Sequence, residues 1–67
     1  MTIKITITRK EIGYYHIVQR IDGMPRIQVS VDRLEHSKGG NIYGYVSTGQ
    51  LVIILTPTDY DMIEYNL

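Results

Sequence analysis

Cysteine, phenylalanine, tryptophan and alanine are all absent from this chain of 67 residues. Without cysteine, the fold has neither disulfide bonds nor thiolate metal ligands. The two histidines, His16 and His36, lie far apart in the sequence and are a poor basis for a zinc site, which normally uses four ligands. A domain of this size buries only about 60% of the surface of its unfolded chain, so its stability is marginal. Self-association or docking on a partner is the remaining way to add stability.

An excess of charge of one sign is also lacking, because seven Lys and Arg residues balance seven Asp and Glu residues. A dedicated duplex-binding module is usually clearly basic, so this balance counts against one. Long apolar runs are missing too, since the longest, residues 51–55, has only the length of a strand. The N-terminal residues alternate and lack the apolar segment of a signal peptide. We therefore expect a cytoplasmic protein without membrane contact.

β-branched and aromatic residues dominate the composition, which favours strands over helices. The segment TIKITIT alternates polar residues with isoleucine and predicts a half-buried strand over residues 2–8. A connection follows over residues 9–13, and the next strands are predicted over residues 14–21 and 26–34. A hairpin over residues 41–55 supplies two more strands. All of these elements belong to a single domain that spans residues 1–67.

The turn at residues 22–23 decides which residues of the second strand face the core. A two-residue loop pairs His16 with Val29 and turns the histidine inward, whereas an odd loop pairs Ile17 with Val29. The odd register gives the more apolar inner face. We therefore predict a loop of three or five residues with a bulge, which leaves Pro25 outside the hydrogen-bonded ladder, where its missing N–H does no harm.

The C-terminal segment begins with a helix-start pattern. Thr56 is a suitable cap, Pro57 suits the first helical position, and Asp59 places an acid in the first turn. An extended tail is the alternative, because Met62 and Tyr65 fit a helical stripe poorly. A helix would place three residues on one face: Tyr60, Ile63 and Leu67.

Together these elements predict a mainly β fold. The expected architecture is a single small antiparallel domain, a five-stranded open barrel or sandwich of SH3-like or OB-like type, with either a short C-terminal helix or an extended tail.

Catalytic signatures are absent from the sequence. Ser30, Ser37 and Ser47 are not framed by a motif such as G-x-S-x-G, and the acids are spread singly instead of paired. The SKGGN segment, residues 37–41, leads into a strand, whereas phosphate-binding loops lead into a helix, so it is interpreted as a hairpin connection. We expect no enzyme activity, no catalytic or metal site and no cofactor.

The segment NIYGYVSTGQLVIIL, residues 41–55, predicts a hairpin that closes at Thr48 and Gly49 and is apolar on both faces. The larger aliphatic face would join the core through Ile42, Val46, Leu51, Ile53 and Leu55. The second face needs a cover, because a contiguous apolar patch of this kind marks an interaction surface. Either the C-terminal segment folds back over it, or a second copy or a target protein covers it. This predicted protein interface consists of Tyr43, Tyr45, Val52 and Ile54.

The order Tyr43-Gly44-Tyr45-Val46 is similar to the RNA-binding strand of RRM domains and, more loosely, of cold-shock domains. The resemblance covers four residues, and it implies that bases stack on the two tyrosines. The chain departs from the RRM pattern around them and leaves no room for the two RRM helices. Single-stranded nucleic acid binding is therefore the alternative function, with five candidate residues: Tyr43, Tyr45, Lys38, Arg20 and Arg26.

The first functional hypothesis is a non-catalytic protein-binding domain that acts as a small regulator or inhibitor. Its partners would be a target protein and other copies of itself, as a homodimer or a higher oligomer. Small accessory proteins encoded by viruses commonly have this profile, and such a protein would act in the host cytoplasm.

Overall fold

The alternating N-terminal segment forms β1 (Ile3–Arg9), an inner strand of a four-stranded sheet that we call sheet A. This computed structural model describes residues 1–11 and 13–67, so Ile12, within the predicted connection, lies outside the described residues. In sheet A the order is β3 (Met24–Val31), β2 (Tyr15–Ile21), β1 and β7 (Met62–Asn66). In the three-stranded sheet B the order is β4 (Arg33–His36), β5 (Ile42–Tyr45) and β6 (Leu51–Leu55).

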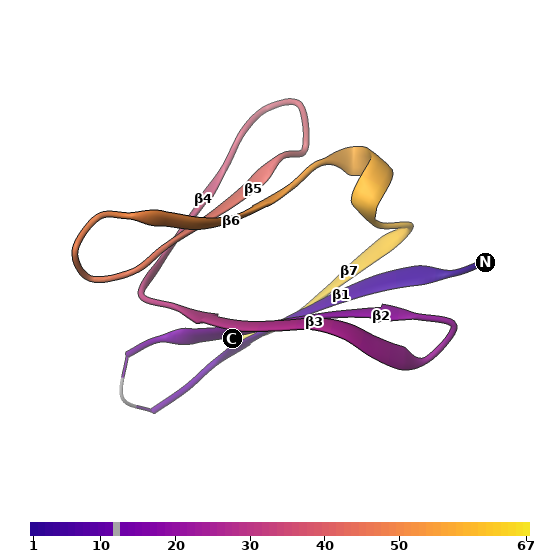
Figure 1. Ribbon diagram of the computed structural model, residues 1–67, viewed down its shortest axis with the longest axis horizontal. Helices are drawn as coiled ribbons and strands as arrows, with labels where there is room; N and C mark the ends of the chain where they lie inside the picture. Colours follow the sequence, from indigo (N-terminus) through magenta and orange to yellow (C-terminus); the bar gives the residue numbers. More distant parts are fainter. Residues whose placement is uncertain (12) are drawn as a thin grey trace.

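The two sheets are connected at two places, as the ribbon in Figure 1 shows. Asp32 alone separates β3 from β4, so the third predicted strand continues from sheet A into sheet B. A short 3-10 turn (Pro57–Asp59) leads from β6 to β7. Antiparallel neighbours are consecutive along the chain, and β7 lies parallel to β1. The mainly β prediction is confirmed, and the two sheets do not close into a full barrel. The prediction of five antiparallel strands is wrong: the described residues form seven strands, because the third predicted strand breaks at Asp32 and residues 62–66 add a strand parallel to β1.

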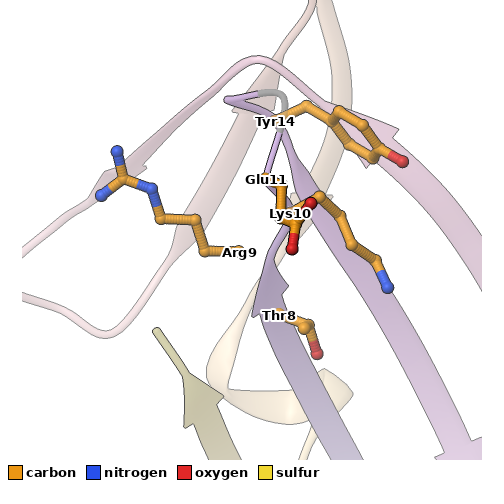
Figure 2. A pocket seen from close by; sticks show the side chains of 5 residues that line it. All are labelled: Thr8, Arg9, Lys10, Glu11 and Tyr14. Carbon is orange, nitrogen blue, oxygen red and sulfur yellow. The ribbon is translucent and has the colours of Figure 1, made fainter.

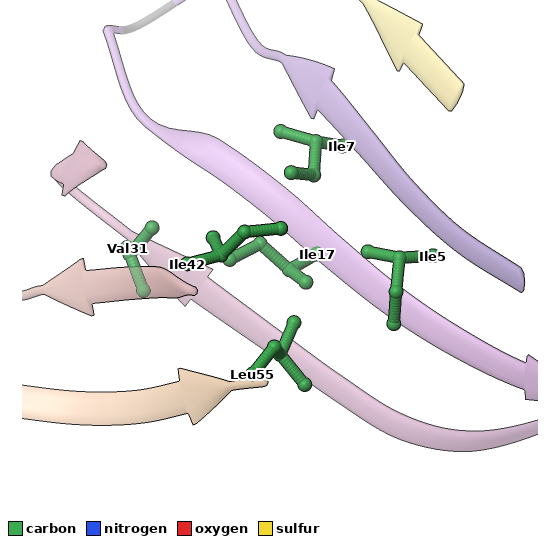
Figure 3. Close-up of a cluster of buried hydrophobic side chains, with 6 residues drawn as sticks. All are labelled: Ile5, Ile7, Ile17, Val31, Ile42 and Leu55. Carbon is green, nitrogen blue, oxygen red and sulfur yellow. The ribbon is translucent and has the colours of Figure 1, made fainter. Parts of the chain in front are cut away.

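The core lies between the two sheets and is made of aliphatic side chains (Figure 3). Ile5 and Ile7 of β1 and Ile17 of β2 are fully buried, and Ile3 is half-buried, because each strand turns alternate side chains inward. Burying each such side chain contributes roughly 1.5–3 kcal/mol to folding. Six residues form the central cluster: Ile5, Ile7, Ile17, Val31, Ile42 and Leu55.

The β2–β3 connection combines a two-residue turn with the register of an odd loop. Asp22 and Gly23 both have positive φ, 50° and 85°, and they form a two-residue turn. A bulge at residue 26 then shifts the register by one, so Ile17 pairs with Val29 as predicted. Pro25, however, pairs with Arg20 inside the ladder, so its predicted exclusion is wrong. The ladder tolerates it because β3 is an edge strand.

The predicted C-terminal helix is wrong. The predicted cap at Thr56 does form, since the Thr56 backbone N–H donates to the Asp59 carboxylate at 2.7 Å. The helical turn that follows it, however, ends after three residues. Residues 62–66 form a strand instead, because Ile63 and Tyr65 alternate with outward residues and pair with Ile5 and Ile7 of β1. The extended-tail alternative is therefore the better description, and the tail is a paired strand.

Gln19 and Tyr60 hold the 3-10 turn between the sheets. The Gln19 side chain, only 4% exposed, donates from Nε2 to the Asp59 carbonyl at 2.7 Å. The Tyr60 hydroxyl donates to the Gly40 carbonyl at 2.6 Å, in the loop between β4 and β5. These two bonds fix the point at which the chain returns from sheet B to sheet A.

The β5–β6 hairpin has a longer loop than predicted. The Gly49 N–H donates to the Val46 carbonyl at 2.8 Å, and the Val46 N–H donates to the Gln50 carbonyl at 3.0 Å. The ladder then shifts by one residue, so Leu51 pairs with Tyr45 and not with Val46. The predicted core position of Leu51 is therefore wrong, and its side chain is exposed. The predicted pairing of Tyr45 with Val52 is wrong for the same reason, whereas the three pairs from Gly44–Ile53 to Ile42–Leu55 are confirmed.

Candidate protein-binding face

The side of sheet B that faces away from the core brings together the four residues predicted as a protein interface. One cross-strand row joins Glu35, Tyr43 and Ile54, and another joins Arg33, Tyr45 and Leu51. The register shift adds Val52 between these rows. Val52 and Ile54 are 41% and 51% exposed, and the two tyrosines are half-buried. We call this surface the tyrosine face, and it consists of Arg33, Glu35, Tyr43, Tyr45, Leu51, Val52 and Ile54.

Gly44 lies between the two tyrosines on β5, on the opposite side of the strand from their rings. The side of β5 that carries Gly44 lies directly against the core. A Cβ on this glycine would lie 2.6 Å from Ile53 Cγ2 and 2.8 Å from Val31 Cγ1, which is closer than side chains can approach. The glycine therefore lets sheet B pack closely on sheet A at the corner where β3 ends. The aromatic–Gly–aromatic order has a packing cause in this fold.

Polar contacts position the two rings of the face. The Arg33 guanidinium lies 4.2 Å from the centre of the Tyr45 ring, and it also forms a 2.7 Å ion pair with Glu35. At such an exposed site the cation–π contact contributes about 0.5–1 kcal/mol. Asn41 Nδ2 donates to the Tyr43 hydroxyl at 3.2 Å. Polar groups thus lie on the β4 side of the tyrosine face, and apolar side chains lie on its β6 side, with β5 between them.

Arg33 belongs to the tyrosine face but is not among the predicted interface residues. The predicted third strand ends at residue 34, and residues 37–41 are predicted as a hairpin connection. The signal that could have found it is the pairing of residues 33–36 with residues 42–45 around the glycine-rich turn, which places Arg33 beside Tyr45.

The C-terminal segment does not cover the tyrosine face. Tyr60 and Ile63, which were expected to lie over it, pack against the core cluster instead. Leu67, the third expected residue, is 74% exposed. The fold-back alternative is therefore wrong, because β7 finds its partner strand in sheet A.

The cations of the nucleic-acid alternative are dispersed over the fold. Arg20 lies on the outer side of sheet A, where it pairs with Lys4, and Arg26 is the extra residue of the bulge in β3. Lys38 lies in the loop between β4 and β5, and its side chain is exposed. The structure places none of these three on the strands that hold Tyr43 and Tyr45.

His36 and Tyr65 form a contact between the two sheets. His36 Nε2 and the Tyr65 hydroxyl lie 2.7 Å apart, and the ring centres are 5.7 Å apart. Partial burial raises the pKa of Tyr65 above its ordinary value, and the nearby Tyr60 raises it further. The poor fit of Tyr65 to the helical stripe was the sequence signal for its position on a strand.

A shallow hollow of about 440 Å³ lies at the β1–β2 connection, away from the tyrosine face. It is lined by Thr8, Arg9, Lys10, Glu11 and Tyr14. Figure 2 shows that the Arg9 and Lys10 side chains point in different directions, so their charges do not converge on one point.

Two further observations concern residues 1–11 and 13–67. No helix in this part of the chain is long and apolar enough to cross a membrane. Within the same residues, no group of three or more His, Asp or Glu side chains is placed to hold a metal ion.

No protein family, curated protein or solved structure matches the chain.

Proposed function

We propose that this chain is a non-catalytic protein-binding domain, a small regulator or inhibitor, that docks on its target through the tyrosine face. The observation that supports this most is the exposure of Leu51, Val52 and Ile54 together on one side of sheet B, next to two tyrosines. Exposed apolar residues grouped in this way are typical of interaction sites, whereas single ones are common on any surface.

The chemistry of the face suits a protein partner. Tyrosine offers an apolar ring with a polar tip, and it is enriched in interfaces together with arginine. The Arg33–Glu35 pair lies at the margin, where it stays hydrated when the apolar centre is buried. A polar margin around an apolar centre is the usual anatomy of an interface.

An open barrel of SH3-like type is the architecture that we propose for the fold. Its support is the simple meander order, in which the third strand bends from sheet A into sheet B and the last strand is interrupted by the 3-10 turn. An OB-fold is a Greek-key barrel, which requires antiparallel neighbours that are not consecutive in the chain.

The test compares two tyrosine variants as baits for partner capture from a lysate of the source cells. Tyr45→Ser removes a ring from the tyrosine face, and Tyr14→Ser removes one from the hollow at the β1–β2 connection. We expect the wild-type chain and Tyr14→Ser to capture the same protein, and Tyr45→Ser to capture about tenfold less or lower still, as for an interface hot spot. Similar melting temperatures would show that both variants are folded. Equal capture by the two variants would contradict the proposal.

Single-stranded nucleic acid binding is the second candidate. It is supported by the position of Tyr43 and Tyr45 on one exposed face with the Arg33 guanidinium over one ring. Binding would quench tyrosine fluorescence when an oligonucleotide is added, and it would weaken steeply with salt. A flat titration at low salt would exclude this candidate.

A further inference from the structure

Within residues 1–11 and 13–67, four strands have a hydrogen-bonded neighbour on one side only: β3, β4, β6 and β7. Three of these edges contain residues that discourage pairing with another chain. β3 has Pro25 and Arg26, β4 has Arg33 and Glu35, and β7 has Glu64. The sequence of β6 is LVIIL, with no proline and no charge.

A free strand edge offers unpaired N–H and C=O groups to any other strand. Soluble proteins usually protect such edges with charged residues, prolines or bulges. In β6 the single protective feature is the irregularity at Val52. Beyond it, residues 53–55 pair regularly with β5, so the C-terminal part of β6 is a regular, uncharged edge.

We propose that β6 pairs antiparallel with β6 of a second copy of this chain, with the two Ile54 residues opposite each other. The two three-stranded sheets B would then form one continuous sheet of six strands, a size that is common in globular proteins. This inference deepens the proposed function, because it names the second copy as a partner and assigns the contact to an edge that borders the tyrosine face.

Several observations favour a second copy of this chain over a strand of another protein as the partner of β6. The chain has seven positive and seven negative side chains, so two copies do not repel each other through net charge. The edge itself has no charge with which to select an acidic or basic peptide. In the self-pair, Ile54 lies opposite Ile54 and Ile53 lies opposite Leu55. Cross-strand side-chain pairs of this kind stabilise sheets.

The pairing has a consequence for the tyrosine face. Residues directly opposite in an antiparallel pair point to the same side of the sheet. Ile54 of both copies would therefore lie on one surface, and the two tyrosine faces would become one double-sized surface. A partner with two equivalent sites would bind such a surface with increased avidity.

The absence of native cysteine allows a direct test by cross-linking. Ile54→Cys places one thiol in β6, and Met62→Cys places one in edge strand β7, where the native side chain is equally exposed, at 52% against 51%. Opposite residues in an antiparallel pair have Cα atoms roughly 4.5–5.5 Å apart, within the range of a disulfide. With oxidised glutathione we expect Ile54→Cys to form a covalent dimer and Met62→Cys to stay largely monomeric. Equal cross-linking of the two variants would overturn the proposal.

Sedimentation of the chain without added cysteine provides a second measurement. We expect the mass to rise with concentration from 7.7 kDa towards twice that value. Ile54→Glu should abolish this rise, and Met62→Glu, at the other edge, should preserve it. A wild-type chain that stays monomeric at high micromolar concentration would overturn the proposal.

Tyr45→Ser separates this inference from the proposed function, because Tyr45 lies on the inner strand of sheet B and not at its edge. A Tyr45→Ser chain that dimerises but captures no target supports both proposals. If the wild-type chain is monomeric and Tyr45→Ser loses the target, the edge pairing fails and the proposed function stands. If Tyr45→Ser dimerises and still captures the target, the proposed function fails and the edge pairing stands. If Tyr45→Ser is folded but monomeric while the wild-type chain dimerises, the copies associate through their faces, and the edge pairing is overturned.

Discussion

Sheets A and B each turn one side towards the shared core, but their outer sides have opposite chemistry. The outer side of sheet A presents Thr6 and Thr8 on β1, with His16 beside them on β2. The outer side of sheet B presents tyrosine, leucine, valine and isoleucine. Both surfaces arise from the same two-residue alternation along strands. The strand pattern therefore determines which side chains face outward, and their chemistry determines what the surface contacts.

The outer side of sheet A has two polar contacts between side chains of neighbouring strands. Lys4 lies 3.4 Å from Glu64, and His16 Nδ1 lies 3.3 Å from the Ser30 hydroxyl. On the outer side of sheet B the polar contacts involve residues of β4, β5 and the loop between them, and all side chains of β6 are apolar.

The largest expected effect comes from substituting one isoleucine on each side of sheet B. Ile42→Ala removes a fully buried side chain and should lower the free energy of unfolding by about 2–5 kcal/mol, because it leaves a cavity. Ile54→Ala truncates an exposed side chain and should cost about 1 kcal/mol or less. Urea unfolding of both variants measures the difference. Equal losses would contradict the assignment of the two sides.

A smaller effect is expected where sheet B approaches sheet A. Gly44→Ala adds a methyl group 2.6 Å from Ile53 Cγ2 and should destabilise the fold by about 1–3 kcal/mol through overpacking. Gly39→Ala is the matched control, since its new Cβ would meet Ser37 Oγ at an ordinary 3.8 Å. Thermal melts of the two variants check this prediction, which fails if Gly44→Ala melts at the same temperature as Gly39→Ala.

The smallest expected effect concerns the contact between the sheets at Tyr65. Its pKa in the folded chain is raised above the ordinary value of 10.0, by burial first and by Tyr60 second. The neutral phenol is therefore favoured by folding. Its contribution to stability is fully present below the unfolded pKa and is lost as the pH rises through the folded pKa.

Melting temperatures between about pH 9 and pH 11 test this contribution. The wild-type chain should lose more stability over this range than Tyr65→Phe, which has no ionisable group at that position. The difference should be small, because the Tyr65 side chain is 44% exposed and solvent weakens the effect. Parallel pH profiles for the two chains would show that Tyr65 does not contribute.

Much of the fold follows from alternation alone. The inner residues of β1 and the register of β2 with β3 were predictable, since only one parity gives an apolar inner face. The C-terminal strand was not predicted, because the helix-start signal at Thr56 is local, whereas pairing with β1 depends on a strand more than 50 residues earlier. The bulge at Val52 was missed for a similar reason: loop geometry around Gly49 sets the register there.

The candidate site was predictable in its central residues and not at its margin. Alternation within the hairpin placed Tyr43, Tyr45 and Ile54 on one face, as the structure does. Leu51 was assigned to the core because the predicted turn was too short. Arg33 could not be placed until the strand pairing of β4 with β5 was known.

The most direct test of the proposed docking face is the footprint of a protein partner on the labelled chain. Amide signals of an isotope-labelled sample can be followed by nuclear magnetic resonance while a lysate of the source cells is added. We predict that Tyr43, Tyr45 and Ile54 lose the most intensity, while Thr6 and Thr8 on the outer side of sheet A keep theirs. The largest losses at Thr6 and Thr8, or equal losses on both sheets, would contradict the account.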